Sequence, residues 1–136
     1  MNIKILTRSE NFIITNEWET AYLIRLKDNH KIIIGEFYGD PTCAFIQENE
    51  KYCIIGGYGF IIYYIREPFI PYESNIKTDQ WIEFYREKNN ELWIESIYNG
   101  DSGNEVKMIV DPFDKIKGGI YVFDIEKKKI KRLLPE

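Results

Sequence analysis

The feature that most constrains the fold of this chain is the stretch 51–66, which reads K-Y-C-I-I-G-G-Y-G-F-I-I-Y-Y-I-R. It contains five aromatic residues, five isoleucines and three glycines, and its charged residues stand only at the two ends. β-branched and aromatic side chains favour strands, and glycine permits the backbone angles of a tight turn. The stretch therefore predicts two core strands joined by a bend at Gly56-Gly57-Tyr58-Gly59.

The composition extends this prediction to the rest of the chain. Ten Tyr and eight Phe accompany abundant isoleucine, whereas Ala, a strong helix former, occurs only twice. A chain of 136 residues, with 44% hydrophobic and 29% charged residues, has the usual size and balance of one folded domain. We therefore expect a single all-β domain, residues 1–136, with few or no helices.

Hairpins are the main local pattern. Segments rich in β-branched and aromatic residues flank short turns rich in charged residues and Asn, which predicts antiparallel pairs. Two strands, 2–6 and 11–15, precede them, and Asp111-Pro112-Phe113-Asp114 predicts a type I turn. We expect four hairpins: 21–27 with 32–38, 42–47 with 52–56, 81–86 with 92–98, and 119–125 with 130–134.

The spacing of the hairpins limits how they can be assembled. The segments between them leave no room for long helices, and parallel strands need a crossover of a dozen or more residues, so we expect antiparallel sheets. At about 40–45 residues per four-stranded blade, the chain is long enough for about three blades. A closed propeller has four or more. We therefore expect antiparallel hairpins in a partial (half) β-propeller or a curled meander.

Few residues could carry chemistry. His30 is the only histidine and lies in a predicted turn, without the positioned partner that general acid–base catalysis needs. The glycines of the bend at 56–59 are not followed by Lys-Ser/Thr or a helix, as in a phosphate-binding loop. Cys43 and Cys53, with one histidine, do not supply four close metal ligands, and we expect both to be small buried residues. No catalytic residue, metal site or cofactor is therefore predicted.

Charge and hydropathy limit the partners. The longest apolar run, 60–65, is far shorter than the ~20 residues of a membrane-spanning helix, and the first residues lack signal-peptide features. We therefore expect a cytoplasmic protein without a membrane contact. Residues 71–125 contain 11 acidic against 6 basic side chains. This acidic body argues against direct binding of nucleic acid and is compatible with a basic partner, while the basic run 127–132 predicts a solvated edge strand.

The third predicted hairpin has two possible registers. A three-residue loop pairs Glu83 with Glu95 and Tyr85 with Trp93, whereas a two-residue turn pairs Phe84 with Glu95. We prefer the first register because it separates an apolar face from a face of Trp, Tyr and Glu. That second face is either a solvated outer surface, with its Trp residues beneath neighbouring loops, or a binding surface with aromatic anchors.

The chain resembles a family of bacterial proteins. An acidic single domain of this size, with a hairpin series and no catalytic residues, looks like the immunity proteins of contact-dependent inhibition and other polymorphic toxin systems. Its ending, G-I-Y-V-F-D-I-E-K-K-K-I-K-R-L, is similar to the half-β-propeller kind. The resemblance implies a cytoplasmic antitoxin, a monomer that binds a cognate toxin domain one to one. The expected toxin is a basic nuclease, neutralised by occlusion of its active or substrate-binding surface.

The resemblance also implies which residues bind. Carboxylates would replace the phosphates of the nuclease substrate, and aromatic rings would fill the base-stacking space. An alternative is a non-catalytic β-rich ligand- or peptide-binding module, with residues 56–64 lining an aromatic pocket; an enzyme is not expected. The expected partner-binding residues lie on the third hairpin and the loop after it: Trp81, Glu83, Tyr85, Glu87, Glu91, Trp93, Glu95, Asp101 and Glu105.

Overall fold

The computed structural model describes residues 3–135, and every regular element in them is a β-strand. None of these residues belongs to a helix that could cross a membrane. The twelve strands are β1 (Ile3–Arg8), β2 (Phe12–Glu17), β3 (Thr20–Arg25), β4 (His30–Glu36), β5 (Cys43–Ile46), β6 (Tyr52–Gly57), β7 (Gly59–Tyr64), β8 (Trp81–Phe84), β9 (Ile94–Asn99), β10 (Glu105–Val110), β11 (Gly119–Asp124) and β12 (Lys129–Leu134).

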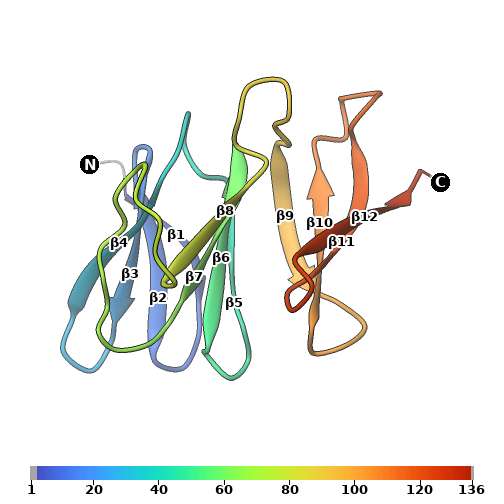
Figure 1. Ribbon diagram of the computed structural model, residues 1–136. Helices are drawn as coiled ribbons and strands as arrows, with labels where there is room; N and C mark the ends of the chain where they lie inside the picture. The colour runs from blue at the N-terminus through green and yellow to red at the C-terminus, as the bar shows by residue number, and fades with distance from the viewer. Residues whose placement is uncertain (1–2, 136) are drawn as a thin grey trace.

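The strands form three antiparallel sheets of four strands each, which we call blades (Figure 1). Blade 1 contains β1 to β4, blade 2 contains β5 to β8 and blade 3 contains β9 to β12. Within each blade, every strand pairs with its neighbours in sequence. The blades meet along their first strands, because β1 contacts β5 and β5 contacts β9. The predicted all-β arrangement, an open half β-propeller of antiparallel strands, is therefore confirmed.

Two hydrophobic cores join the blades. The first lies between blades 1 and 2 and includes Ile14, Leu23 and Ile55. The second lies between blades 2 and 3 and includes Ile54 and Met108. Because adjacent residues of a strand point to opposite faces, β6 supplies both cores, and all of its residues are buried. Blade 2 is therefore the central layer of the molecule.

Most of the predicted local pairings are present. The hairpins β3–β4, β5–β6 and β11–β12 match three of the four expected ones. The glycine-rich bend is the turn between β6 and β7, with Tyr58 at its tip. β1 and β2 are the two expected N-terminal strands, although Asn2 of the first lies outside the described residues. The amide of Asp114 donates to the carbonyl of Asp111 (3.1 Å), which closes the turn expected there.

The third predicted hairpin, 81–98, is wrong. β8 is the last strand of blade 2 and pairs with β7, whereas β9 is the first strand of blade 3 and pairs with β10. Residues 85–93 connect the two blades, and the carbonyl of Leu92 accepts a hydrogen bond from the amide of Gly59 (2.7 Å). Neither expected register exists, because an alternating apolar pattern determines which face of a strand is buried but not which strand lies beside it.

Candidate functional site

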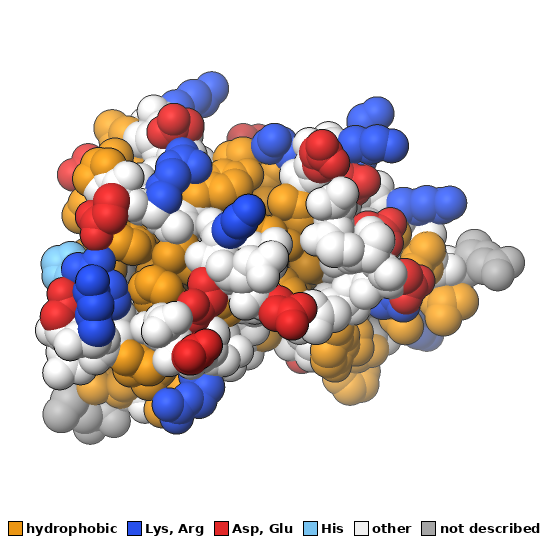
Figure 2. Space-filling model, turned by 90° about the horizontal axis from the view of Figure 1, so that it is seen from below, with side chains coloured by type: hydrophobic (Ala, Val, Ile, Leu, Met, Phe, Trp, Pro, Cys, Tyr) orange, Lys and Arg blue, Asp and Glu red, His pale blue; other side chains and the backbone are white. Residues whose placement is uncertain are grey.

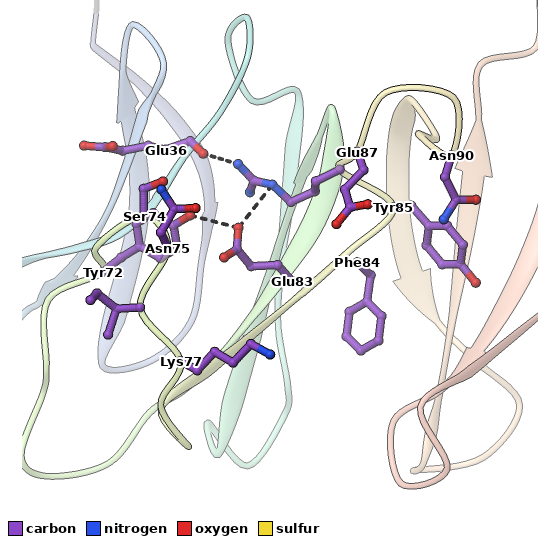
Figure 3. A pocket seen from close by; sticks show the side chains of 12 residues that line it. Glu36, Tyr72, Ser74, Asn75, Lys77, Glu83, Phe84, Tyr85, Glu87 and Asn90 are labelled. Carbon is purple, nitrogen blue, oxygen red and sulfur yellow. Dashed lines mark hydrogen bonds and ion pairs between the residues drawn. The ribbon is translucent and has the colours of Figure 1, made fainter.

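A pocket of about 650 Å³ lies beside β8 on the outer side of blade 2 (Figure 3). Its walls come from β8 and the residues after it, from the connection between β7 and β8, and from the end of β4. Three predicted partner-binding residues, Glu83, Tyr85 and Glu87, line it, so we take it as the candidate site. The other lining residues are Glu36, Tyr72, Ser74, Asn75, Ile76, Lys77, Phe84, Arg86 and Asn90.

The connection between β7 and β8, residues 65–80, forms one wall of the pocket. It has no regular secondary structure, but hydrogen bonds hold it against two blades. The amide of Tyr72 donates to the carbonyl of Ile33 in β4 (2.8 Å), and the hydroxyl of Tyr63 in β7 donates to the carbonyl of Ile70 (2.7 Å). The wall therefore has a defined position although it is a long loop.

Trp81 lies beneath this wall and not on an exposed face. It is only 4% exposed, and its ring centroid is 5.2 Å from that of Tyr72 and 6.4 Å from that of Tyr63. The position agrees with the interpretation in which this tryptophan is covered by a neighbouring loop. In this structure Trp81 supports Tyr72 by packing and presents little surface to a partner.

Glu83 is held in one orientation by two neighbours. The hydroxyl of Tyr72 donates to Oε1 of Glu83 (2.8 Å), and Nε of Arg86 lies 3.3 Å from the same oxygen (Figure 3). Burial raises the pKa of Tyr72, and the hydrogen bond to Glu83 raises it further, so the hydroxyl stays a neutral donor. Because both contacts reach Oε1, the second carboxylate oxygen of Glu83 is left to accept a hydrogen bond from a partner.

Arg86 connects this site to blade 1. Its guanidinium lies over the ring of Phe37, 4.4 Å from the centroid, and Nη2 donates to the backbone carbonyl of Glu36. Burial lowers the pKa of Arg86, while the charge of Glu83 opposes that shift. Since its contacts are with the protein itself, we consider Arg86 a positioning residue that orients Glu83 and joins the two blades.

The charges around the pocket favour a cationic ligand. Three carboxylates, from Glu36, Glu83 and Glu87, line it together with the basic side chains of Lys77 and Arg86. Arg86 is engaged through Nε and Nη2, whereas its buried Nη1 has no partner. The free oxygen of Glu83 can accept from an ammonium or guanidinium group. Within residues 3–135, no cluster of three or more His, Cys, Asp or Glu is arranged to hold a metal ion. The arrangement is suited to binding a basic side chain.

The remaining predicted residues lie away from the pocket. Trp93 is 39% exposed on the connection between blades 2 and 3, and Glu91 lies near it, 3.8 Å from the amine of Lys117. Glu95 is exposed on β9. Asp101 and Glu105 lie at and after the β9–β10 turn, at the opposite end of the sheets. The structure therefore divides the expected set among four places: the pocket side of β8, the blade 2–3 connection, β9 and the β9–β10 turn.

Sequence reasoning missed two residues that complete the pocket, Tyr72 and Arg86. Tyr72 follows Pro71 in an irregular connection, and nothing in the pattern links it to Glu83. In the predicted hairpin 81–98, strand alternation puts Arg86 on the same face as Phe84, but β8 ends at Phe84 and Tyr85 has a positive φ of 54°. This left-handed residue breaks the strand alternation, which allows Arg86 to reach the carboxylate of Glu83.

Comparisons with known proteins bear on the fold. No family model matches the sequence, and no curated protein matches it. Among solved structures, the chain is similar to hydrazine synthase of Kuenenia stuttgartiensis, with a TM-score of 0.57 and 10% sequence identity. The match covers 90% of this chain and 34% of that chain, so this chain spans about a third of the length of that protein chain. At this identity the likeness supports the arrangement of strands alone.

Proposed function

We propose that the protein is a cytoplasmic immunity protein of a bacterial polymorphic toxin system. It binds a basic toxin domain, a nuclease, and neutralises it by occluding the active or substrate-binding surface. The observation that carries this proposal is Glu83, an oriented carboxylate with one free oxygen in a pocket with two further carboxylates. The acidic sequence and the open half-propeller fold are consistent with it.

The chemistry of nucleases explains why such a carboxylate would inhibit one. A nuclease presents Arg and Lys side chains to the phosphates of its substrate. A carboxylate offers the same kind of acceptor to these side chains, and charge-assisted hydrogen bonds are among the stronger ones. Because Tyr72 and Arg86 already orient Glu83, binding would cost little further loss of side-chain freedom.

Co-expression tests the function directly. An immunity gene should lie directly downstream of its toxin gene, so the candidate toxin is a domain of the protein encoded immediately upstream. We expect this domain to stop growth when it is expressed alone and to be harmless when it is co-expressed with the chain. Light scattering of the purified pair should show a one-to-one complex. Growth arrest that persists despite soluble immunity protein would contradict the proposal.

Glu83→Gln tests the pocket within that function. The substitution keeps the side-chain shape and one acceptor oxygen but removes the charge. We expect slower association with the toxin domain, on the order of tenfold at low salt, and a smaller dependence of the rate on salt. Stopped-flow measurements at several salt concentrations would show both effects. Glu48→Gln, an exposed residue of the β5–β6 turn, is the matched control and should change neither.

The pocket also favours a second candidate, a non-catalytic ligand- or peptide-binding module, although none of the residues 56–64 that were expected to line its site lies in this pocket. Its volume of about 650 Å³ falls within the ~300–1,000 Å³ usual for small-ligand sites. Trp81 lies beneath Tyr72 and would report an occupant through its fluorescence. Titration with free arginine separates the two functions, because a surface that docks a whole basic domain binds a single amino acid only weakly. Saturable, micromolar binding in the absence of any toxin would favour the module.

A further inference from the structure

One end of the three blades gathers five loops into a single surface. It is the upper end in Figure 1, and it carries the turns β2–β3, β4–β5, β6–β7, β8–β9 and β10–β11. Hydrogen bonds join neighbouring loops of this surface. Oε2 of Glu19 accepts from the amide of Gly39 (2.7 Å), and the carbonyl of Trp93 accepts from the amide of Asp111 (2.9 Å). We call this surface the loop end: residues 17–20, 36–42, 57–59, 85–93 and 111–118.

The loop end exposes large hydrophobic side chains. Tyr38 is 75% exposed, and Phe113 is 90% exposed. Within the described chain, the five short turns at the opposite end (8–11, 26–29, 47–51, 100–104 and 125–128) contain no exposed large hydrophobic residue, whereas the long connection 65–80, which starts at that end, exposes Ile70 (39%) and Ile76 (46%). Exposed apolar clusters mark interaction sites more often than isolated apolar residues do. The exposed hydrophobic residues of the loop end are Trp18, Tyr38, Trp93, Phe113 and Ile116.

The charge of the loop end is also distinct. Its loops contain eight Asp and Glu against four Lys and Arg, a difference of −4. The five turns at the opposite end contain six against five, a difference of −1. Figure 2 views that opposite end from below and shows Lys and Arg side chains interspersed with Asp and Glu. The acidic excess therefore coincides with the exposed aromatic residues.

Three aromatic rings form the centre of the loop end. Tyr58 packs edge-on against Tyr38 and against Trp93, with ring centroids 5.4 Å and 5.2 Å apart. Burial raises the pKa of Tyr58, and the nearby charge of Glu91 adds to the shift, so the phenol remains neutral. Backbone hydrogen bonding and the charge of Lys117 lower the pKa of Glu91, which keeps it ionised. An ionised carboxylate thus lies beside accessible aromatic rings.

We propose that the loop end is the docking surface for a basic protein, whose Arg or Lys side chains lie against the Tyr38–Tyr58–Trp93 cluster and pair with the surrounding carboxylates. This proposal rests on the proposed function, and the partner is the same toxin domain. Cations bind to the faces of Trp and Tyr rings, and a nearby carboxylate adds to that attraction. A patch of exposed aromatic residues with an acidic surround is typical of interaction hot spots.

The candidate pocket is continuous with the loop end. Glu36, Arg86 and Glu87 belong to both, and the guanidinium of Arg86 lies over Phe37, next to Tyr38. One partner can therefore contact the oriented carboxylate of Glu83 and the aromatic cluster together. Aromatic platforms also bind single-stranded nucleic acid. The eight carboxylates of the loop end would repel a phosphate backbone, which favours a basic protein.

The test compares aromatic residues inside and outside the loop end. The double variant Tyr38→Ala/Trp93→Ala removes two exposed rings, and we expect the dissociation constant for the toxin domain to rise at least tenfold. Tyr98→Ala, which removes a ring 51% exposed on β9, is the matched control and should leave affinity unchanged. Circular dichroism and thermal melting show whether each variant is folded. If the double variant is unfolded, Trp93→Phe is the milder substitution to use.

The outcomes separate this inference from the proposed function. If the toxin domain binds and Glu83→Gln weakens binding but the loop-end variants do not, the loop end is not the docking surface although the function stands. If no toxin domain binds, a hexa-arginine peptide serves as the probe. We then expect saturable binding that is lost in Tyr38→Ala/Trp93→Ala, and none of a hexa-glutamate peptide. Arginine-peptide binding that is the same in wild type and variant would overturn the inference.

Discussion

The two cysteines have different surroundings, yet both thiols are protonated near neutral pH. Cys53 is fully buried in the first core, and burial raises its pKa far above the ordinary value of 9.0. Cys43 is half-buried, and burial, together with the charge of Glu95, raises its pKa to about 11. The prediction of two buried cysteines is confirmed for Cys53, and Cys43 keeps some exposure. Neither is activated as a nucleophile, because the thiolate is the reactive form.

We therefore expect the native protein to react slowly with Ellman's reagent at pH 8. The reaction of Cys43 should accelerate from pH 9 to about 11, as its thiolate forms. Because the folded protein holds the proton of Cys43 more tightly than the unfolded chain does, this thiol favours folding below pH 9. The contribution to stability is lost as the pH rises to about 11. Cys53→Ala leaves Cys43 as the single thiol and assigns the profile. Rapid reaction of that variant at pH 8, without unfolding, would contradict the raised pKa.

Individual site residues were predictable to the extent that strand alternation places them together. Glu83, Tyr85 and Glu87 do line one pocket, but Phe84 and Arg86 line it too, because the chain leaves the strand after Phe84. Tyr72 could not be found, because its approach to Glu83 depends on the path of an irregular connection. Arg86 could not be placed either, because the positive φ of Tyr85 ends the alternation.

The turn between β6 and β7 is the element on which the blade 2–3 connection depends. Gly59 has a φ of 74°, and its amide donates to the carbonyl of Leu92 (2.7 Å) in the next connection. An added Cβ would lie 2.2 Å from Cγ of Arg86 and 2.5 Å from the carbonyl oxygen of Phe84. The glycine therefore permits both the turn and the close approach of the residues that follow β8.

Gly59→Ala should destabilise the protein by about 2–4 kcal/mol, from the left-handed backbone and the clash combined. Urea unfolding, followed by circular dichroism, measures the change in the free energy of unfolding. Gly103→Ala is the control, because nothing lies within 4 Å of an added Cβ there and no positive φ is required. Its effect should stay within about 1 kcal/mol of zero. Equal effects of the two substitutions would disprove this account of the turn.

Hairpins were predictable as elements wherever the two strands are neighbours within one blade. Turn residues between β3 and β4, for example, directly predict that pair. The pair β8 and β9 has the same local pattern but lies across a blade boundary. Nothing local in 85–93 distinguishes a long hairpin turn from a connection between blades. That choice is made by Leu92 and Trp93, which contact the distant β6–β7 turn.

The whole molecule should unfold as one unit, because both cores share blade 2. Ile54 and Ile55 are adjacent in β6, fully buried, and point into different cores. Ile54→Val and Ile55→Val should each destabilise the protein by about 1 kcal/mol while leaving a single transition. Ile3→Val, 47% exposed on β1, is the control and should have little effect.

Two probes check this cooperativity. Far-ultraviolet circular dichroism reports all three blades. The fluorescence of buried Trp81, measured with Trp18 and Trp93 both replaced by Phe, reports the first core. Coincident transitions in the wild type and in both core variants are expected. If the Ile55→Val variant shows a fluorescence transition at a lower urea concentration than its circular dichroism transition, the first core unfolds independently.

At the scale of the whole molecule, the fold class could be predicted from the sequence. The excess of β-branched and aromatic residues, the short polar turns and the chain length together predict antiparallel hairpins in a partial β-propeller or a curled meander, and the structure has three antiparallel blades. The loop end could not be predicted, because its five loops are distant in sequence and meet only when the blades are assembled. Trp93 was expected to bind as a neighbour of Tyr85, but its ring packs on Tyr58 in the β6–β7 turn.

The burial of β6 on both faces has a consequence for how such a chain can diverge. A substitution in a terminal blade disturbs one core and leaves its far face free to vary, whereas every position of β6 meets neighbours on one side or the other. Substitutions should therefore accumulate in blades 1 and 3 and be rare in β6. The stretch 52–57 is thus the part of the chain by which a distant relative would be recognised.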